Sequence, residues 1–536
     1  MFLEQVKKYL PKVLDKAPKI LLGVLLFVMI WFYMSNSFDT DGGWHMRFGQ
    51  SVLDGQFPYR DTLTWSYHGY DWVNMSWGGD ILFWVMYTTL GYQSQVILMT
   101  IVTFLAFILI TALPKKEINW VGMAVAVFTL YLLDYTLIKR LSFFAPLFLA
   151  GLIYLLEGKI KKNIYWVLPA GFWLWAFLHG SWILGFITIN IYVMGNLLQN
   201  LLHRYKPLFL LSNWNKTDFI RVIFAEILAF FVIAINPYGF RLFAEIMSVF
   251  TNPGPIKYIL EFTPSYNYPI YFGSVICSVV ILILALILVF RKKLTFAQGL
   301  LLIVFFISGI RYKRNIFYIL FIGIPVLTGV AVYIWGEFEK SLLKNLFGTK
   351  KYRVGQIFLT GICLVSISFI YYFGSRVNIS NDVWNNRNLN RPIILPFTAA
   401  KFLQNEVGNE PVRIFSEFNW TGYFEWLSPK AYYFLDGRTL RHPVLQKISL
   451  IDKYYAYYYD EGGLKDLENE QVKYILLRNI STSPLAKPDF LNQIFFGITL
   501  NKAYNNDPSQ LEKDLRDNKD WILIYTDRMA NIWKRK

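Results

Sequence analysis

The sequence predicts a polytopic α-helical membrane protein with a soluble α/β domain at its C-terminus. Three observations lead to this fold class. The 536 residues are 55% hydrophobic and only 17% charged, a composition that excludes an ordinary soluble globule. Apolar runs long enough to cross a bilayer follow one another over residues 1–373, whereas residues 374–536 are rich in charge and turn residues. We therefore expect a membrane domain over 1–373 and an extracytoplasmic domain over 374–536.

The membrane domain is predicted from the length of its apolar segments. A helix needs roughly 17 to 25 apolar residues to cross a hydrocarbon core, because unpaired backbone groups are too costly there. About eleven segments meet this need, some of them short. They are Ile20–Met34, Gln95–Leu113, Trp120–Leu137, Ser142–Leu156, Ile164–Leu178, Trp182–Leu201, Ile220–Ile235, Tyr271–Phe290, Phe296–Ile310, Ile316–Trp335 and Gly355–Phe373.

Basic residues set the expected orientation of these helices. Lysines precede the first apolar run, which lacks a small-residue cleavage site, so a retained signal anchor with its N-terminus inside is expected. Further basic clusters fall in alternate loops, as the positive-inside rule requires, and they account for the formal net charge of +17 without a nucleic-acid partner. They are Lys115–Lys116, Lys159–Lys162, His203–Lys206, Arg291–Lys293 and Lys340–Arg353. An odd number of crossings of the cytoplasmic (inner) membrane then places the C-terminal domain outside.

The C-terminal region has the pattern of a small α/β domain, with short β-type runs and amphipathic helices. The expected strands are Val412–Phe415, Ala431–Leu435, Val472–Leu477 and Trp521–Tyr525, and the expected helices are Pro396–Val407 and Pro508–Asp517. Two outward segments of the membrane domain, the outer loop 35–94 and the segment 236–269, are too long and polar to be simple connectors. Their stretches Ile81–Leu90 and Phe240–Phe250 predict helices that lie in the membrane interface.

The outer loop opens with two carboxylates and an imidazole, Asp39, Asp41 and His45, directly after the first crossing. Acidic residues near lipid are expensive to desolvate unless they are paired or used, so these residues are candidates for function. A carboxylate at this boundary could serve as a general base, and an Asp-x-Asp pair could instead hold a divalent cation. The alternative is structural, with Asp41 capping a helix from Gly43 to Leu53.

The same loop continues with Asp61, Trp77 and Asp80 among Trp65, Tyr67 and Trp72. Sugar sites combine aromatic faces with carboxylate and amide hydrogen-bonding groups, so the cluster is a candidate substrate site. The aromatic belt found at any membrane interface is the alternative explanation for each Trp and Tyr.

Several outward turns carry cations, against the topological bias. The candidates are Lys139, Arg140, Arg311, Lys313 and Arg314, with His179 at the outward end of the fifth crossing. Guanidinium groups bind phosphate bidentately, so a lipid-linked phosphate would explain their position. Snorkelling of these side chains toward headgroups, and simple packing of His179, are the alternatives. The sequence contains no phosphate-binding Gly loop, His-Glu-x-x-His or Cys-x-x-Cys, which argues against a nucleotide-driven pump and a zinc protease.

These motifs together resemble a bacterial family of GT-C-like membrane proteins, distantly similar to the dolichyl-phosphate-mannose and aminoarabinose transferases. The resemblance covers nearly the whole chain. It is carried by Asp39-Thr40-Asp41, Trp44-His45, Gly49, Gly55, Pro58, Asp61, Trp72-Val73 and Trp77, then by Arg140–Phe144, Asn236–Gly239, Phe415–Tyr423 and Phe434–Thr439. One departure is Gly42-Gly43, where the family commonly carries a bulkier residue before the Trp, so a looser local backbone is expected.

The resemblance implies an inverting transfer of sugar from a polyprenyl-phosphate donor to a glycan, lipid or protein acceptor on the outer face. It gives Asp41 the role of base, with Asp39 second and His45 supporting. Arg140, Arg311 and Arg314 would hold the donor phosphate, and the outer domain would grip the acceptor. The alternative is a non-catalytic or polymer-handling membrane protein, such as a polysaccharide polymerase, ligase or flippase relative. A transporter should show internal repeats, which are not evident.

Overall fold

The structure is a computed structural model, and its contacts divide the chain into two compact units. The residues that it describes are 2–36, 39–113, 117–133, 136, 140–205, 214–251, 260–262, 264–268, 271–338, 396–439, 449–479 and 508–536. Unit 1 comprises Met1–Phe38, Leu90–Asn236 and Glu261–Asn386. Unit 2 comprises Asp39–Thr89, Pro237–Leu260 and Arg387–Lys536, so most of the outer loop belongs to the same unit as the C-terminal region.

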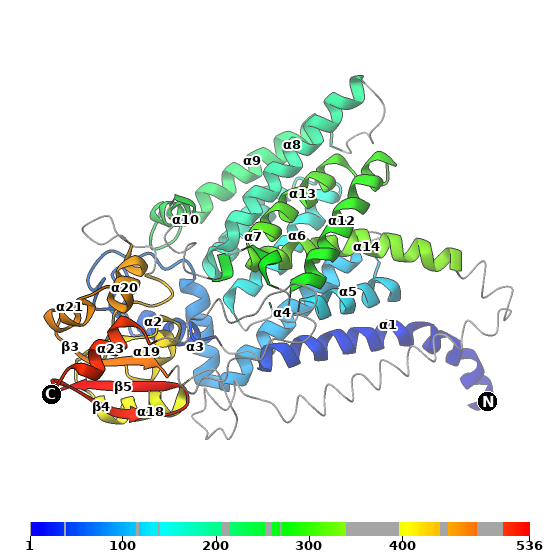
Figure 1. Cartoon of the computed structure of the whole chain (residues 1–536). Coiled ribbons are helices and arrows are strands. Elements are labelled where there is room, and N and C mark those ends of the chain that lie inside the picture. The colour runs from blue at the N-terminus through cyan, green and yellow to red at the C-terminus, as the bar shows by residue number, and fades with distance from the viewer. Residues whose placement is uncertain are drawn as a thin grey trace. The chain divides into compact units, whose positions relative to one another are not determined.

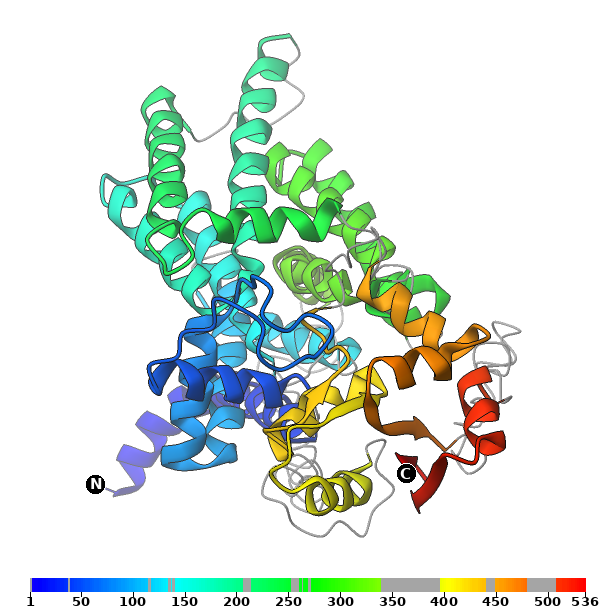
Figure 2. The same cartoon turned by 90° about the vertical axis from the view of Figure 1, so that its left-hand side faces the viewer.

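Unit 1 is a helical bundle. Its helices are α1 (Phe2–Asn36), α4 (Tyr92–Ala112), α5 (Trp120–Leu132), α6 (Phe144–Glu157), α7 (Ile164–Leu178), α8 (Ile183–Tyr205), α9 (Lys216–Ile233), α12 (Phe272–Phe290), α13 (Phe296–Arg311) and α14 (Ile316–Phe338). Within the bundle, α4 packs against α6, α7 against α9, α8 against α13 and α5 against α14. Figure 1 labels these helices, and Figure 2 shows the bundle from a second side. Short 3₁₀ turns connect some of them, namely η2 (Leu141–Phe143), η3 (Gly180–Trp182), η4 (Leu260–Phe262), η5 (Ser265–Asn267) and η7 (Lys313–Asn315).

Five helices of the described residues are long and apolar enough to cross a membrane, and four shorter apolar helices accompany them. Each of the first ten predicted spans coincides with one of the helices α1, α4 to α9 and α12 to α14. The eleventh, 355–373, lies outside the described residues. Polar caps mark where several helices begin, for example a capping box in which Thr295 accepts from the backbone of Gln298 at the start of α13.

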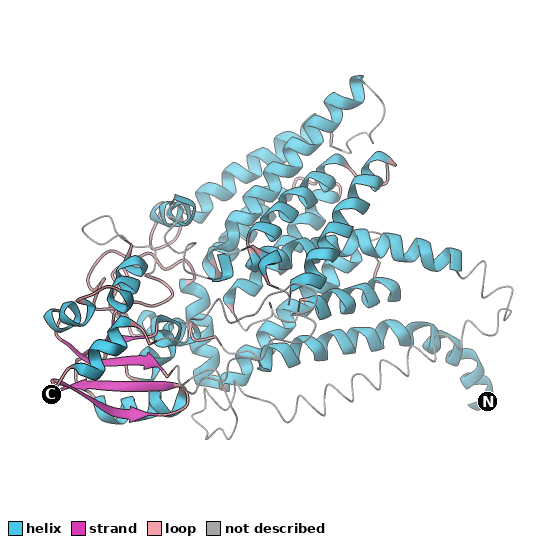
Figure 3. Cartoon of the chain, in the orientation of Figure 1, coloured by secondary structure: helices cyan, strands magenta, loops and turns pink. Residues whose placement is uncertain are grey.

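Unit 2 contains a five-stranded mixed sheet (Figure 3). The strands are β1 (Arg413–Ser416), β2 (Tyr432–Tyr433), β3 (Val472–Arg478), β4 (Trp521–Thr526) and β5 (Ala530–Arg535), in the order β2-β1-β3-β5-β4. β1 runs parallel to β2 and β3, whereas β5 is antiparallel to β3 and β4. The four predicted strands are present, and β5 is an additional one that the sequence analysis did not predict.

Helices cover both faces of this sheet. The helices are α18 (Phe397–Val407), α19 (Phe418–Leu427), α20 (Leu450–Tyr459), α21 (Gly463–Asn469) and α23 (Gln510–Asp517). Successive side chains of a strand point to opposite faces. On β3, Ile475 joins a core with residues of α20, α21 and α23, whereas the hydroxyl of Tyr474 bonds Glu406 of α18. Both predicted helices are present, as α18 and α23.

The outer loop contributes two helices to unit 2, α2 (Gly42–Leu53) and α3 (Trp77–Leu90), and the segment after α9 contributes α10 (Arg241–Thr251). The loop between α2 and α3 joins the sheet region directly. Thr64 forms an isolated parallel bridge with Tyr433, and Trp65 packs against the core of α20, α21 and α23. The domain boundary predicted at residue 374 lies outside the described residues.

Candidate functional site

Asp41 occupies the N-cap position of α2, but its side chain does not cap the helix. Its carboxylate makes no capping hydrogen bond to the helix backbone. The Trp44 Nε1 donates to Asp41 Oδ1 instead, over 3.3 Å. The carboxylate also lies against Gly437, where a Cβ atom would come within 2.7 Å of Asp41 Oδ1. The alternative in which the Asp41 side chain caps α2 is therefore not what the structure shows.

Asp39 has a local, backbone-directed role. Its side chain is 4% exposed, and its Oδ1 accepts a hydrogen bond from the backbone N–H of Asp41 over 3.3 Å. The carbonyl of Asp39 accepts a further bond from the N–H of Gly42. Asp39 thus shapes the turn that presents Asp41, which fits a supporting position better than that of a second base.

Gly43, the second of the two glycines before Trp44, has a packing function. A Cβ atom on Gly43 would lie 1.8 Å from the carbonyl oxygen of Gly422 in α19, and one on Gly422 would lie 2.4 Å from the carbonyl oxygen of Thr40. The backbones of α2 and α19 therefore touch directly, and only glycine fits at either position. The sequence analysis expected these glycines to loosen the backbone, whereas the structure uses Gly43 to bring two elements into contact.

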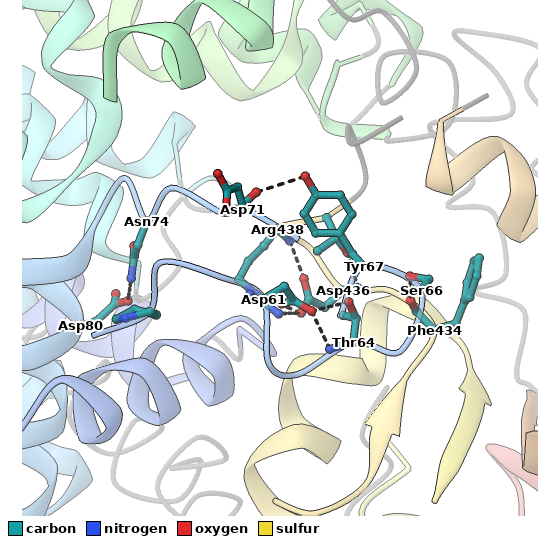
Figure 4. A network of polar contacts seen from close by, with 12 residues as sticks. Asp61, Thr64, Ser66, Tyr67, Asp71, Asn74, Asp80, Phe434, Asp436 and Arg438 are labelled. Carbon is teal, nitrogen blue, oxygen red and sulfur yellow. Dashed lines mark hydrogen bonds and ion pairs between the residues drawn. The ribbon is translucent and has the colours of Figure 1, made fainter. Parts of the chain in front are cut away.

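His45 pairs with Asp80 across the interface of α2 and α3. The His45 Nδ1 lies 2.5 Å from Asp80 Oδ1. The other oxygen of the fully buried Asp80 accepts from Asn74 Nδ2 over 2.7 Å (Figure 4). The hydroxyl of Ser76 adds a third bond to Asp80, over 3.2 Å. An imidazole whose Nδ1 donates to a carboxylate keeps Nε2 as an acceptor. His45 and Asp80 are thus brought together, with Asp80 holding the ring and buried away from any substrate.

Asp61 is held in a buried ion cluster with Asp436 and Arg438. Arg438 Nη1 donates to Asp61 Oδ1 over 2.9 Å, and its Nε donates to Asp436 Oδ2 over the same distance (Figure 4). The second oxygen of Asp61 accepts from the backbone N–H and hydroxyl of Thr64. Asp61 is fully buried in this cluster, and its predicted contact with substrate stays a prediction. Burial alone would lower the pKa of Arg438, but Asp436 and Asp61 raise it above its usual value.

Arg438 also connects this cluster to Asp41. Its guanidinium lies over the rings of Trp44, Phe48 and Trp72, at 5.7, 4.6 and 4.8 Å from their centroids. Trp44 in turn donates to Asp41, so an unbroken set of contacts runs from the ion cluster to the candidate base. The sequence analysis noted the Asp436-Gly437-Arg438 motif but did not name these residues as part of the site.

A third carboxyl, Glu425 on α19, is buried beside the same cluster. It is 2% exposed, and neither of its oxygens has a hydrogen-bond partner within bonding distance. Burial, together with the nearby charge of Asp436, raises the pKa of Glu425 well above its usual value. The raised pKa favours the protonated form of Glu425, and the sequence analysis did not identify this residue.

Trp77 begins α3 and belongs to an aromatic cluster of unit 2. Its ring meets Phe57 edge-on at 5.9 Å, and Phe57 in turn contacts Tyr59 and Tyr238. The hydroxyl of Tyr238 donates to the carbonyl of Pro58 over 2.8 Å. Tyr238, from the part of this turn that belongs to unit 2, is thus tied to the outer loop.

In unit 1, two of the predicted phosphate-binding arginines share one carboxylate. Arg140 Nη1 lies 2.9 Å from Glu261 Oε1, and Arg314 Nη1 lies 3.8 Å from Glu261 Oε2. These residues come from the turn before α6, from η4 and from η7. Arg140 lowers the pKa of Glu261 to about 2, against the opposing effect of burial, and Arg314 adds to the decrease. Glu261 was missed because a lone acid among aromatic residues carries no motif.

The remaining predicted cations have separate surroundings. Arg311 Nε donates to the hydroxyl of Tyr312, and the Lys313 ammonium lies 3.9 Å from the ring centroid of Tyr268. His179 accepts from the backbone N–H of Ser181 and so caps the turn η3, which fits the packing alternative. Lys139 lies outside the described residues.

The structure therefore assembles two sets of candidate residues. One, in unit 2, surrounds Asp41, and the other, in unit 1, surrounds Glu261. Their convergence on one pocket stays a prediction. Among the described residues, no group of three or more His, Cys, Asp or Glu side chains is placed to hold a metal ion.

Comparison with known proteins shows similarity in fold. No protein-family model matches the sequence, and no curated protein is significantly similar to it. The Archaeoglobus fulgidus oligosaccharyltransferase, tethered with an acceptor peptide containing the NVT sequon, superposes with a TM-score of 0.56 at 12% identity over 87% of this chain and 70% of that chain. AglB of the same organism, in complex with an inhibitory peptide and a dolichol-phosphate, gives 0.52 at 12% identity over 88% and 69%.

A third similar structure spans nearly the full length of both proteins. ArnT from Cupriavidus metallidurans, bound to undecaprenyl phosphate, gives a TM-score of 0.50 at 11% identity over 96% of this chain and 97% of that chain. Identities this low establish the fold and nothing finer. The protein thus has the GT-C-like fold of the oligosaccharyltransferase AglB and of ArnT.

Proposed function

We propose that the protein is a membrane glycosyltransferase that transfers a sugar from a polyprenyl-phosphate donor to an acceptor on the outer face of the cytoplasmic membrane. The observation that carries the proposal is the placement of Asp41. Its carboxylate lies at the start of α2 but does not cap it, and Trp44 and Gly437 hold it in place. A carboxylate held at this position is a candidate for proton transfer.

In the proposed reaction the acceptor hydroxyl oxygen attacks C1 of the sugar from the face opposite the phosphate. The bond between C1 and the phosphate oxygen breaks, and its electron pair leaves on the polyprenyl phosphate. Asp41 takes the proton of the hydroxyl, and attack from the opposite face inverts the configuration at C1. Asp39 supports the loop. His45 lies on α2, the helix that follows Asp41, and Asp80 of α3 holds its imidazole.

The donor phosphate is assigned to the arginine cluster of unit 1. Arg140 and Arg314 meet at Glu261. Lys313 belongs to the same turn as Arg314, and Arg311 ends the preceding helix α13. Guanidinium groups stabilise the charge that develops on a departing phosphate. AglB was solved in complex with a dolichol-phosphate and ArnT bound to undecaprenyl phosphate, which supports a lipid phosphate as ligand here.

The acceptor is assigned to unit 2 and is a glycan, a lipid or a protein. A divalent cation is possible, since the Archaeoglobus oligosaccharyltransferase has been solved in complex with Zn and sulfate. Two other acidic residues of the outer loop are already engaged, because Asp39 accepts from a backbone N–H and Asp61 is paired with Arg438. We therefore derive no step through a metal.

Mass spectrometry of surface glycans from cells with and without this gene would identify the product. Purified protein in liposomes would then be assayed with the polyprenyl-phosphate donor of the sugar found in that product. Asp41→Asn should abolish transfer, whereas Asp54→Asn, the same change at the exposed far end of α2, should leave it intact. Arg140→Gln should raise the KM for the donor, with Arg291→Gln as the matched control. Full activity of Asp41→Asn would remove the base assignment.

A further inference from the structure

Glu261 occupies the position that a phosphate would take between two arginines. Its two oxygens face different guanidinium groups, Arg140 over 2.9 Å and Arg314 over 3.8 Å. A carboxylate and a phosphate oxygen edge have the same geometry toward guanidinium. Arg140 lies 121 residues before Glu261, and Arg314 follows it in a separate turn, η7. The three side chains meet at a site where Glu261 is 36% accessible.

The net charge of this cluster stays positive even with Glu261 in place, so the cluster still attracts anions. Arg140, Arg311, Lys313 and Arg314 provide four positive charges close to η4 and η7, against the single negative charge of Glu261. Because Arg140 keeps the pKa of Glu261 near 2, this carboxylate stays charged at every working pH. An incoming phosphate must therefore compete with a permanent internal anion.

We propose that Glu261 is an internal competitor for phosphate monoesters, and that it promotes release of the lipid-phosphate product. This inference rests on the proposed function. The donor is a phosphodiester with one negative charge, whereas the product is a phosphomonoester that carries up to two, since the electron pair of the broken bond stays on its oxygen. Glu261 repels the product more strongly than the donor, and it can take over both arginines when the product leaves.

A merely structural Glu261 would behave in the opposite way. If its role were to hold Arg140 and Arg314 in place, removing its charge would disorder the arginines and weaken the binding of every anion. If it competes, removing its charge must strengthen binding, and more so for a dianion than for a monoanion. The sign of the change therefore separates the two roles.

The experiment measures binding of a short-chain prenyl phosphate, a prenyl phosphodiester and inorganic phosphate to the purified full-length protein. Glu261→Gln keeps the size and an acceptor for Arg140, and it should bind the prenyl phosphate on the order of tenfold more tightly, with a smaller gain for the diester. Glu117→Gln, at an exposed carboxylate of unit 1, is the matched control and should change nothing. If the Glu261→Gln variant does not fold, the same binding measurements are made on Glu261→Ala.

Three results would overturn the inference. These are weaker binding of the prenyl phosphate in both Glu261 variants, unchanged binding, and an equal gain for diester and monoester. A gain for inorganic phosphate as large as that for the prenyl phosphate would assign the site to free phosphate and also exclude the lipid product. Because binding is measured without turnover, absence of sugar transfer by the wild-type protein would count against the proposed function alone.

Discussion

At the scale of single residues, the contact between Asp41 and Gly437 makes a sharp prediction. In Gly437→Ala the new methyl group would lie 2.7 Å from Asp41 Oδ1, so the carboxylate must move. A displacement near 1 Å can cost about 10²-fold in rate. We expect kcat to fall by about that factor while the unfolding temperature changes little, because the obstructing atom is the end of a side chain.

The matched control for this substitution is Gly171→Ala in α7, where a Cβ atom would meet nothing within 4 Å. Its activity and unfolding temperature should equal those of the wild type or exceed them slightly. Wild-type turnover in Gly437→Ala would show that Asp41 does not depend on its contact with the Asp436–Arg438 turn.

Glu425 gives a prediction about pH. Its folded-state pKa is raised, so the folded protein holds a proton that the unfolded chain releases above about pH 4.3. Stability must then fall as the pH rises from that value toward the folded-state pKa. Glu425→Gln removes the titration, so its unfolding temperature should exceed that of the wild type at pH 8, with the difference closing toward pH 5. A constant difference between thermal scans at the two pH values would contradict this account.

At the scale of elements, α2 and α19 meet through glycine. A methyl group on Gly43 would lie 1.8 Å from the backbone carbonyl oxygen of Gly422, which cannot yield as a side chain can. Gly43→Ala must separate the two helices, and overpacking of this kind costs about 1–3 kcal/mol. We expect lower thermal stability together with lost transfer activity, unlike Gly437→Ala, in which activity alone should fall. Thermal unfolding and turnover measured on both variants would separate the two effects.

Elements were predictable where the pattern is local. The ten spans found as helices follow from runs of apolar residues, and β1 to β4 follow from β-branched and aromatic residues between turns. β5 was missed because its six residues mix Asn, Lys and Arg with three buried apolar side chains. Its position depends on the turn before it, in which Asp527 accepts from the N–H groups of Met529 and Ala530.

At the scale of the whole molecule, some residues of the site can be identified from a short segment of sequence, whereas others can be identified only from the folded structure. Asp41 and Arg140 were identified because each lies in a motif or runs against the charge bias. Arg438 and Glu261 were not, since their partners are distant in sequence: Arg438 lies 377 residues from Asp61, and Glu261 lies 121 residues from Arg140. Contacts over such separations leave no periodic signal that a single sequence can show.

The outer loop and the C-terminal region form one unit, so the tail alone should not be a stable domain. Arg438 is buried with Asp61 as one of its two partners, and Trp65 and Tyr67 of the loop pack against the core of the sheet. Without the loop, an expressed fragment 387–536 would expose that core and lose one carboxylate from Arg438, and breaking a buried ion pair costs about 3–5 kcal/mol.

We expect this fragment to lack the near-ultraviolet circular dichroism of packed aromatic rings, and residues 39–89 joined to it by a flexible linker to restore part of the signal. The matched control is the same fusion with Asp61→Asn, which keeps the shape of the side chain but removes its charge. It should recover less order than the wild-type fusion, because Arg438 then keeps only Asp436 as a charged partner. Cooperative unfolding of the fragment alone, at the temperature of the fusion, would instead make the tail an independent domain to which the loop merely attaches.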